Sequence, residues 1–162
     1  MQCWGQNWAG QLGTGNNTDA DTPQTVVGLA GPVRQLAASE SHTCALLENG
    51  SVQCWGLNNG QLGTGNNTNA NTPQAVVGLA GPVRQLAAGG GDYSMHHTCA
   101  VLEGGSVQCW GSNYYGQLGT GNNNGATTPQ AVIGLAGVAR EVAAGLEHVC
   151  ALLESGSVQC WG

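Results

Sequence analysis

A tripeptide, Cys-Trp-Gly, recurs four times along the 162-residue chain. It begins at residues 3, 54, 109 and 160, so successive copies are 51, 55 and 51 residues apart. Repeats of roughly this length are typical of propellers and solenoids, in which each repeat is one supersecondary unit. The segments 11–38 and 61–88 are nearly identical. We therefore divide this single domain into repeats 3–53, 54–108 and 109–159, followed by a duplicated terminal strand at 160–162.

Short apolar runs between turn residues indicate strands. In the first repeat we expect strands at 25–27, 33–37, 43–47 and 51–55, because such runs are bounded by Gly, Pro, Asn and Asp. No window keeps an apolar period of 3.6 residues for three turns. About four antiparallel strands per repeat predict an all-β fold of β-propeller blades. Three repeats are too few to close a ring, so the prediction is a partial propeller unless the chain oligomerises.

The last two strands of each repeat form a predicted hairpin. Its turn, Glu48-Asn49-Gly50 in the first repeat, fits a type I turn followed by a left-handed glycine. In that register Cys44 lies directly opposite Cys54, within the separation that a disulfide tolerates. The same register pairs Cys99 with Cys109 and Cys150 with Cys160. We expect three disulfides and an unpaired Cys3.

Two other interpretations of the cysteines remain open. They are compatible with buried free thiols, as in a cytosolic protein. A zinc site is a weaker alternative, because His42, His97 and His148 each precede a cysteine by two residues. Each such set offers at most one histidine and two cysteines, so we expect structural histidines hydrogen-bonded to the backbone, and neither a metal nor a cofactor.

Disulfides form in oxidising compartments, so we expect a parent protein that is secreted or on the cell surface. From its first residues we expect no signal peptide in this chain. However, Met1 stands where the other repeats have the valine of a strand. The chain therefore looks like part of a longer repeat array, in which Cys3 would have its hairpin partner.

Charge argues against several function classes. Only 7% of residues are charged, just three are Lys or Arg, and the net charge is −6. Nucleic-acid and anionic membrane surfaces both need a cationic track, so neither partner is expected. No catalytic motif with a nucleophile, a metal-binding helix or a phosphate loop is present. We therefore do not expect an enzyme.

The repeats differ most in two loops, which are the candidate binding segments. The loop after Trp-Gly carries Trp8 in the first repeat, Asn58 and Asn59 in the second, and Tyr114 and Tyr115 in the third. Exposed aromatic side chains on loops are frequent anchors of recognition surfaces. Alternatively, they pack over neighbouring blades.

The second variable loop precedes the His-x-Cys segment. It is longer in the second repeat, where it contains Tyr93, Met95 and His96. A longer loop with an aromatic residue is a further candidate for recognition, or it is tolerated drift.

The segment from His42 to Gly65 resembles the repeat of the regulator of chromosome condensation family. The shared pattern is His, Ala-Leu, a glycine turn, Trp-Gly, Asn and Gly-Gln-Leu-Gly, and it extends over essentially the whole chain. The resemblance implies a propeller, typically of seven blades. The cysteine pairs are similar to those of secreted, often bacterial, members.

Fold alone does not define function. The family's founder is a nuclear guanine-nucleotide exchange factor and chromatin binder, a role that the acidic charge of this chain disfavours. A secreted relative inhibits β-lactamases through loops on one propeller face. We predict a non-catalytic protein-binding scaffold that associates with further copies of itself to complete a ring. The alternatives are a secreted enzyme inhibitor and a purely structural or engineered self-assembling module.

Overall fold

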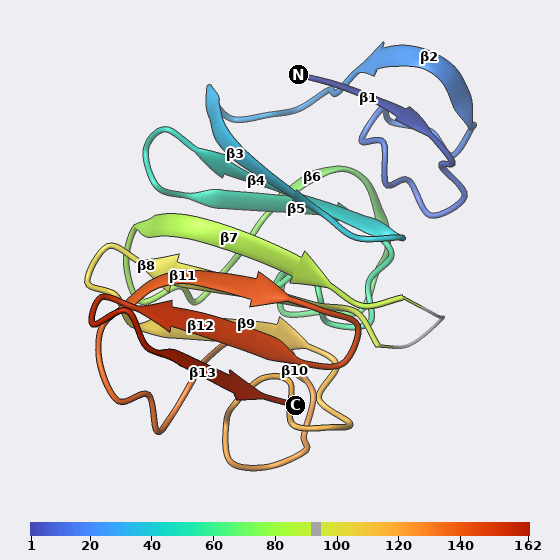
Figure 1. Cartoon of the computed structure of the whole chain (residues 1–162). Coiled ribbons are helices and arrows are strands. Elements are labelled where there is room, and N and C mark those ends of the chain that lie inside the picture. Colours follow the sequence, from blue (N-terminus) through green and yellow to red (C-terminus); the bar gives the residue numbers. More distant parts are fainter. Residues whose placement is uncertain (92–94) are drawn as a thin grey trace.

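The structure is a computed structural model of the whole chain, and it describes residues 1–91 and 95–162. Over these residues the chain forms thirteen strands, β1 to β13, and no helix. The strands make four antiparallel sheets, two of them with four strands. In Figure 1 the first and second sheets lie toward the N-terminus at the top, and the third and fourth sheets overlap in the lower half, where the C-terminus lies. The fold is thus an open arc of propeller blades, as predicted.

Chain order defines the four sheets. The first sheet contains β1 (Gln2–Gly5) and β2 (Ala20–Thr25). The second sheet contains β3 (Val33–Ala38), β4 (His42–Leu47), β5 (Val52–Gly56) and β6 (Ala70–Ala75). The third sheet contains β7 (Val83–Gly89), β8 (His97–Leu102), β9 (Val107–Gly111) and β10 (Ala126–Ala131). The fourth sheet contains β11 (Ala139–Ala144), β12 (Val149–Leu153) and β13 (Val158–Trp161).

The boundaries of the sheets do not coincide with the boundaries of the sequence repeats. Each repeat contributes the outer strand of one sheet and begins the next sheet, so repeat 54–108 contains β6 of the second sheet and β7 and β8 of the third. The first sheet is the outer half of a blade, and the fourth sheet lacks its outer strand. The chain therefore holds two complete blades between two partial ones.

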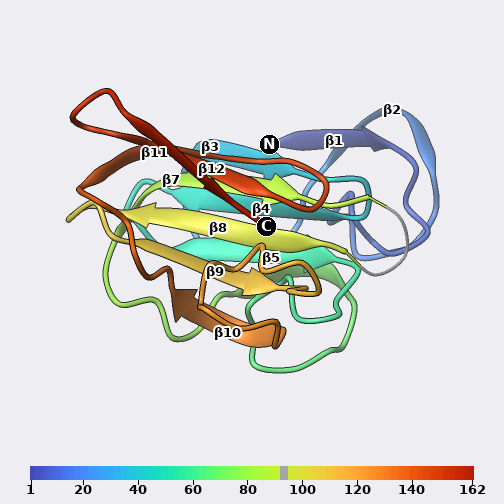
Figure 2. The ribbon, with the colours of Figure 1, turned by 60° about the horizontal axis from the view of Figure 1, so that its bottom comes forward.

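The first strand β7 contacts the first strands β3 and β11 of the neighbouring sheets, and Figure 2 shows these three strands toward the top with β10 at the bottom. The cores of the arc lie between sheets. Trp110, for example, packs with Leu46, Leu62 and Leu86 from elements on either side of the junction. Aliphatic burial of this kind stabilises by roughly 1.5–3 kcal/mol for each large side chain.

The outer strand differs from the expectation. A strand was expected at 25–27 after Thr-Pro-Gln, but β2 spans Ala20–Thr25 and includes Pro23. β6 and β10 likewise include Pro73 and Pro129. Proline has no N–H to donate, so it is tolerated in an outer strand, where one edge needs no partner.

Candidate functional site: the loop face and the sheet junctions

The predicted hairpins place the cysteines as expected. Cys44 pairs with Cys54 across β4 and β5, and the structure contains the disulfide between them with a Cα–Cα distance of 4.1 Å. The disulfides Cys99–Cys109 and Cys150–Cys160 repeat this geometry. Gly50 ends the first turn with a φ of 81°, the left-handed conformation that favours glycine.

Cys3 is the free cysteine among residues 1–91 and 95–162. It lies on β1, and burial raises the pKa of its thiol. The equivalent cysteines of the second and third sheets pair with the preceding strand of their own sheet, which the first sheet lacks.

Strand topology brings both variable loops to one face of the arc. In an antiparallel sheet, the loop joining the first and second strands and the loop joining the third and fourth leave from the same end. Hydrogen bonds join the two: Leu57 N donates to Ser41 O at 2.8 Å, and Ser112 N donates to His96 O at 2.9 Å. We call this end, with loops 6–19, 57–69, 112–125 and the β3–β4, β7–β8 and β11–β12 connections, the loop face.

Several predicted recognition residues are exposed on the loop face. The exposed fractions of Trp8, Tyr114 and Tyr115 are 43%, 67% and 52%, and Asn59 is also exposed. Met95 is half-buried, and Tyr93 lies outside the described residues. Amide nitrogens hold the loop backbone beside two of the rings, because Asn17 donates to Trp8 O and Asn123 donates to Tyr114 O.

The interpretation as recognition residues does not hold for Asn58 and His96. Asn58 is 1% exposed. Its amide nitrogen donates to Asn66 O at 3.0 Å, and its carbonyl oxygen accepts from Gly60 N at 3.0 Å. His96 is 2% exposed, and its ring stacks edge-on against His42 at 5.8 Å. Both side chains therefore serve the interior of the fold.

Sequence reasoning missed the inter-sheet role of Gln-Leu-Gly. The Gln11 carbonyl accepts from Trp55 Nε1 and from Thr43 Oγ1, both at 2.9 Å. The Gln61 carbonyl accepts in the same way from Trp110 Nε1 and Thr98 Oγ1 of the third sheet. Each loop after Trp-Gly thus clasps the following sheet. Its only sequence signal was that Gly-Gln-Leu-Gly-Thr-Gly-Asn-Asn recurs unchanged in all three repeats.

Glycine is required where this clasp closes. Gly63 has a φ of 68°, and a Cβ there would lie 2.8 Å from Trp110 Nε1. A side chain would therefore be strained in its backbone and would also displace the indole that bonds to Gln61.

The repeated histidines bridge sheets as well as bonding within them. His42 Nδ1 lies 2.6 Å from Ser39 Oγ, and its Nε2 lies 2.9 Å from Thr98 Oγ1 of the third sheet. Burial, with a smaller contribution from His96 and His97, lowers the pKa of His42 to about 3. The expected bond to the sheet's own backbone is found at His97, whose Nδ1 faces Met95 O at 3.3 Å.

Burial also lowers the pKa of His97 to about 4. His97 Nε2 has no partner among the described residues. By the repeat, the position that should face it is Val149, where the third sheet has Thr98. His148 of the fourth sheet is exposed.

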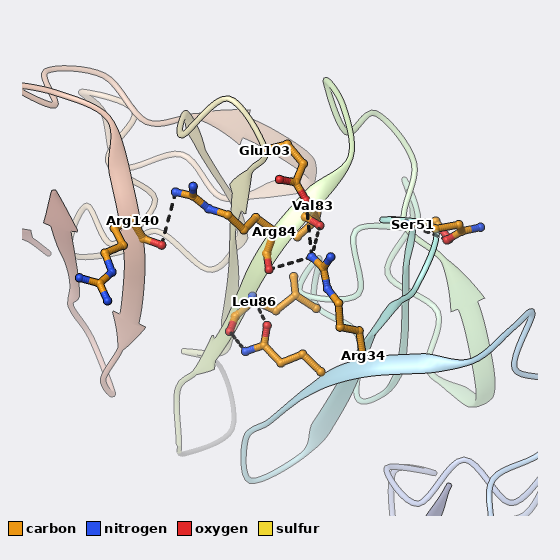
Figure 3. A network of polar contacts seen from close by, with 9 residues as sticks. Arg34, Ser51, Val83, Arg84, Leu86, Glu103 and Arg140 are labelled. Atoms are coloured by element: carbon orange, nitrogen blue, oxygen red, sulfur yellow. Dashed lines mark hydrogen bonds and ion pairs between the residues drawn. The ribbon is translucent and has the colours of Figure 1, made fainter. Parts of the chain in front are cut away.

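A second set of bonds crosses the junctions along the first strands (Figure 3). Arg34 donates to the carbonyls of Val83 and Arg84, each at 2.9 Å, and lies 3.7 Å from Glu103. Gln35 exchanges two 3.0 Å bonds with the backbone of Leu86.

The next junction repeats this pattern. Arg84 donates to the carbonyl of Ala139, and Gln85 exchanges two 3.0 Å bonds with the backbone of Val142. Arg34 and Arg84 therefore act within the arc, each reaching the sheet that follows it.

In the part of the chain that the structure describes, no group of three or more His, Cys, Asp or Glu side chains is placed to hold a metal ion. Across the same residues, no helix is long and apolar enough to cross a membrane.

Sheets of this kind, joined in an arc by clasping loops, define a β-propeller repeat protein. The family profile described as "Regulator of chromosome condensation (RCC1) repeat" matches residues 3–46, 49–101 and 104–152. The chain therefore belongs to the regulator of chromosome condensation repeat family, as the resemblance of residues 42–65 indicated.

Curated relatives share this repeat over almost the entire chain. The chain is 35% identical to the ultraviolet-B receptor UVR8 of Arabidopsis thaliana over 98% of its length, but covers 36% of that receptor. It is 36% identical to the probable E3 ubiquitin-protein ligase HERC4 of Homo sapiens over 99% of its length, but covers 15% of that protein. The chain thus spans about a third or less of these relatives.

Solved structures show the same fold. Human WBSCR16 superposes with a TM-score of 0.84 at 23% identity, over 98% of this chain and 41% of that one. Prp20p of Saccharomyces cerevisiae superposes with a TM-score of 0.81 at 28% identity, over 99% of this chain and 40% of that one. The Prp20p structure is described together with its binding to Gsp1p and histones.

Proposed function

We propose that this chain is a non-catalytic scaffold that binds a protein partner through its loop face. The observation that carries the proposal is the exposure of Trp8, Tyr114 and Tyr115 on loops whose backbones are held in place. Rigid aromatic side chains give large contact areas at low entropic cost, which is why they serve as interface anchors. Prp20p provides a precedent for protein binding in this family.

Charge and disulfides narrow the class of partner. The net charge is −6, and Arg34 and Arg84 are engaged with neighbouring backbone, which disfavours nucleic acid, an anionic membrane and a chromatin or exchange role. Three disulfides support an extracellular or cell-surface protein. A secreted enzyme inhibitor would use the same face, and a structural or engineered module would have no partner there.

The test is capture of extracellular proteins by immobilised chain, comparing two variants that each lose exposed apolar side chains from a different end of the sheets. We expect the triple variant Trp8→Ala, Tyr114→Ala, Tyr115→Ala to lose its specific partners. The control is Ile133→Ala with Val138→Ala, two exposed residues in the β10–β11 connection at the opposite end of the sheets. Equal capture by both variants would refute recognition by the loop face.

We further propose that the incomplete end sheets associate with a second copy. The first sheet offers β1 and β2, which correspond to the third and fourth strands of a blade, and the fourth sheet lacks a fourth strand. Joining them would complete a blade with β1 or β13 in the shared position. Light scattering on the 162-residue chain should give a multiple of 16.4 kDa, and a folded monomer at every concentration would contradict self-association.

A further inference from the structure

A polar groove of about 600 Å³ lies on the loop face between loops 57–69 and 112–125. Its lining residues are uncharged: Asn59, Gly111, Ser112, Asn113, Tyr114, Asn123, Asn124 and Gly125. This volume is within the range of small-molecule sites in proteins. Such a lining offers hydrogen-bond donors and acceptors without selecting for a charge.

A groove at the preceding junction, which overlaps the equivalent position only at Ala9, Thr68 and Asn69, is smaller, and two of its asparagine side chains are paired. It measures about 420 Å³. There the Asn69 carbonyl oxygen caps the backbone N–H of Asn58 at 2.8 Å, and Asn71 donates to Asn17 at 3.3 Å. The two grooves therefore differ in how many polar groups a ligand would find unpaired.

In the third repeat, Gly125 stands where the second repeat has Asn69. The side chain that would cap the backbone N–H of Asn113 is therefore absent. This substitution removes a side chain from the groove wall and leaves the Asn113 N–H without the cap that Asn58 has. Gly125 is not in the left-handed conformation, and a Cβ there would approach Gly111 O at 3.0 Å. Its backbone therefore does not require a glycine, and an asparagine needs only a small local adjustment.

Ser112 supplies a second unpaired group in the same wall. It is 7% exposed, and its hydroxyl has no hydrogen-bond partner among the described residues. The other repeats have Gln6 and Leu57 at this position. A buried hydroxyl without a partner costs about 1–3 kcal/mol. Rotation about its Cα–Cβ bond between staggered positions would offer it to the groove as both donor and acceptor.

Tyr114 forms the rim of the groove. Its ring is largely exposed, and its carbonyl oxygen accepts from Asn123 Nδ2 at 2.7 Å, which fixes the backbone beside the groove. An exposed aromatic ring next to unpaired polar groups suits a ligand with both an apolar C–H face and hydroxyls.

We propose that this groove binds a neutral oligosaccharide. Sugar hydroxyls both donate and accept, so they match Ser112, the Asn113 N–H and the surrounding amides, while a sugar C–H face stacks on Tyr114. An anionic ligand would find no cation in the lining, and an apolar ligand would leave the amides unpaired. The site shares Tyr114 with the proposed protein recognition, but it also depends on Ser112 and Gly125, which the protein recognition does not use.

The experiment is titration of the chain with chitotriose, cellotriose and maltotriose, followed by NMR chemical shifts, with a sulfated oligosaccharide as a charged probe. At least one neutral trisaccharide should bind. Ser112→Leu with Gly125→Asn, which installs the residues of the second repeat, should weaken that binding at least tenfold. Tyr114→Ala should weaken it as well, whereas Tyr114→Phe should keep it.

Trp8→Ala, the matched change in the first repeat, is the control and should leave sugar binding unchanged. Protein capture by the Gly125→Asn variant should also be unchanged, which separates this proposal from recognition through the aromatic residues. Absence of binding by all three neutral sugars, equal binding by the Ser112/Gly125 variant, or preference for the sulfated probe would overturn the proposal. Thermal unfolding verifies that each variant is folded. If Gly125→Asn does not fold, Tyr114→Ala provides an independent test of the proposal.

Discussion

At the level of single residues, the junction between the second and third sheets differs from the junction between the third and fourth sheets by one hydroxyl group, which is replaced by a methyl group. His42 bonds across its junction to Thr98 Oγ1, but the residue that corresponds to Thr98 at the next junction is Val149. Both histidines are buried. His97 therefore keeps an unpaired nitrogen in the interior, at a cost that His42 avoids.

Val149→Thr should stabilise the fold by roughly 0.5–1.5 kcal/mol, because it would pair His97 Nε2 and donate to the Gln117 carbonyl. The reciprocal change, Thr98→Val, should destabilise by about 1–3 kcal/mol, since it leaves His42 Nε2 unpaired. Urea unfolding of both variants measures the difference. If the two substitutions shift stability in the same direction, histidine pairing is not the cause.

The buried histidines also make stability depend on pH. An unfolded histidine titrates near 6.5, whereas burial lowers the pKa of His42 to about 3 and of His97 to about 4. On acidification the unfolded chain binds protons first, so the stabilising contribution is complete above about pH 6.5 and is lost as pH falls toward 4.

Unfolding by urea at pH 7.5 and pH 5.0 should therefore give a lower free energy of unfolding at the acidic value, by up to about 1.4 kcal/mol per pH unit and histidine. His148→Gln is the control, because His148 is exposed and the variant retains the buried His42 and His97. Equal stability at both pH values would contradict the role of buried neutral histidines.

The loops after Trp-Gly are the elements that make the arc continuous. Each is organised by one asparagine: Asn7, Asn58 and Asn113 all donate to carbonyls of the Asn-rich segment further along the same loop. In this loop conformation, the carbonyl of the glutamine in Gln-Leu-Gly accepts a hydrogen bond from the tryptophan of the next sheet. A local amide thus determines a contact between sheets.

Asn58→Ala should destabilise the chain by at least about 2 kcal/mol, because it leaves several buried groups of the loop unpaired. Asn59→Ala, one residue away and exposed, should change stability by no more than about 0.5 kcal/mol. Thermal unfolding of the two variants measures both losses of stability. Similar losses from both would show that loop composition, rather than the Asn58 amide, is responsible.

The contrast between Asn58 and Asn59 also explains what sequence can predict here. The register of Cys44 and Cys54 followed from a three-residue turn, so it was a local problem and the prediction is confirmed. The pairing of β5 with β6 spans a 13-residue loop, and the sheet boundaries depend on it. Asn58 looks exposed in the sequence because it lies in a polar Asn-Asn-Gly loop, and its partners up to ten residues away are not visible there.

At the scale of the whole molecule, hydrogen bonds link the first strand of each sheet to the first strand of the next sheet. Gln35 and Gln85 each exchange two bonds with the following first strand. The fourth sheet has Glu141 at this position. A carboxylate accepts from an N–H but does not donate to a carbonyl, so the next junction, wherever its strand comes from, is weaker by one bond.

Glu141→Gln should therefore strengthen self-association of this chain, lowering the dimer dissociation constant by up to about tenfold, since one hydrogen bond contributes roughly 0.5–1.5 kcal/mol. Sedimentation velocity over a dilution series measures the constant. Glu154→Gln, an exposed turn residue, controls for the change in net charge. An equal effect of both variants would exclude pairing through the first strands.

The offset between repeats and sheets affects how the number of repeats in such a chain can change by recombination. Because every clasp and every Arg–Gln pair joins one repeat to the next, gain or loss of one full period by recombination leaves each remaining junction with the same partners. The near-identity of 11–38 and 61–88 fits such an event. Repeat number is then free to vary while local contacts are inherited intact, and the curvature of the arc alone limits how many blades a closed ring accepts.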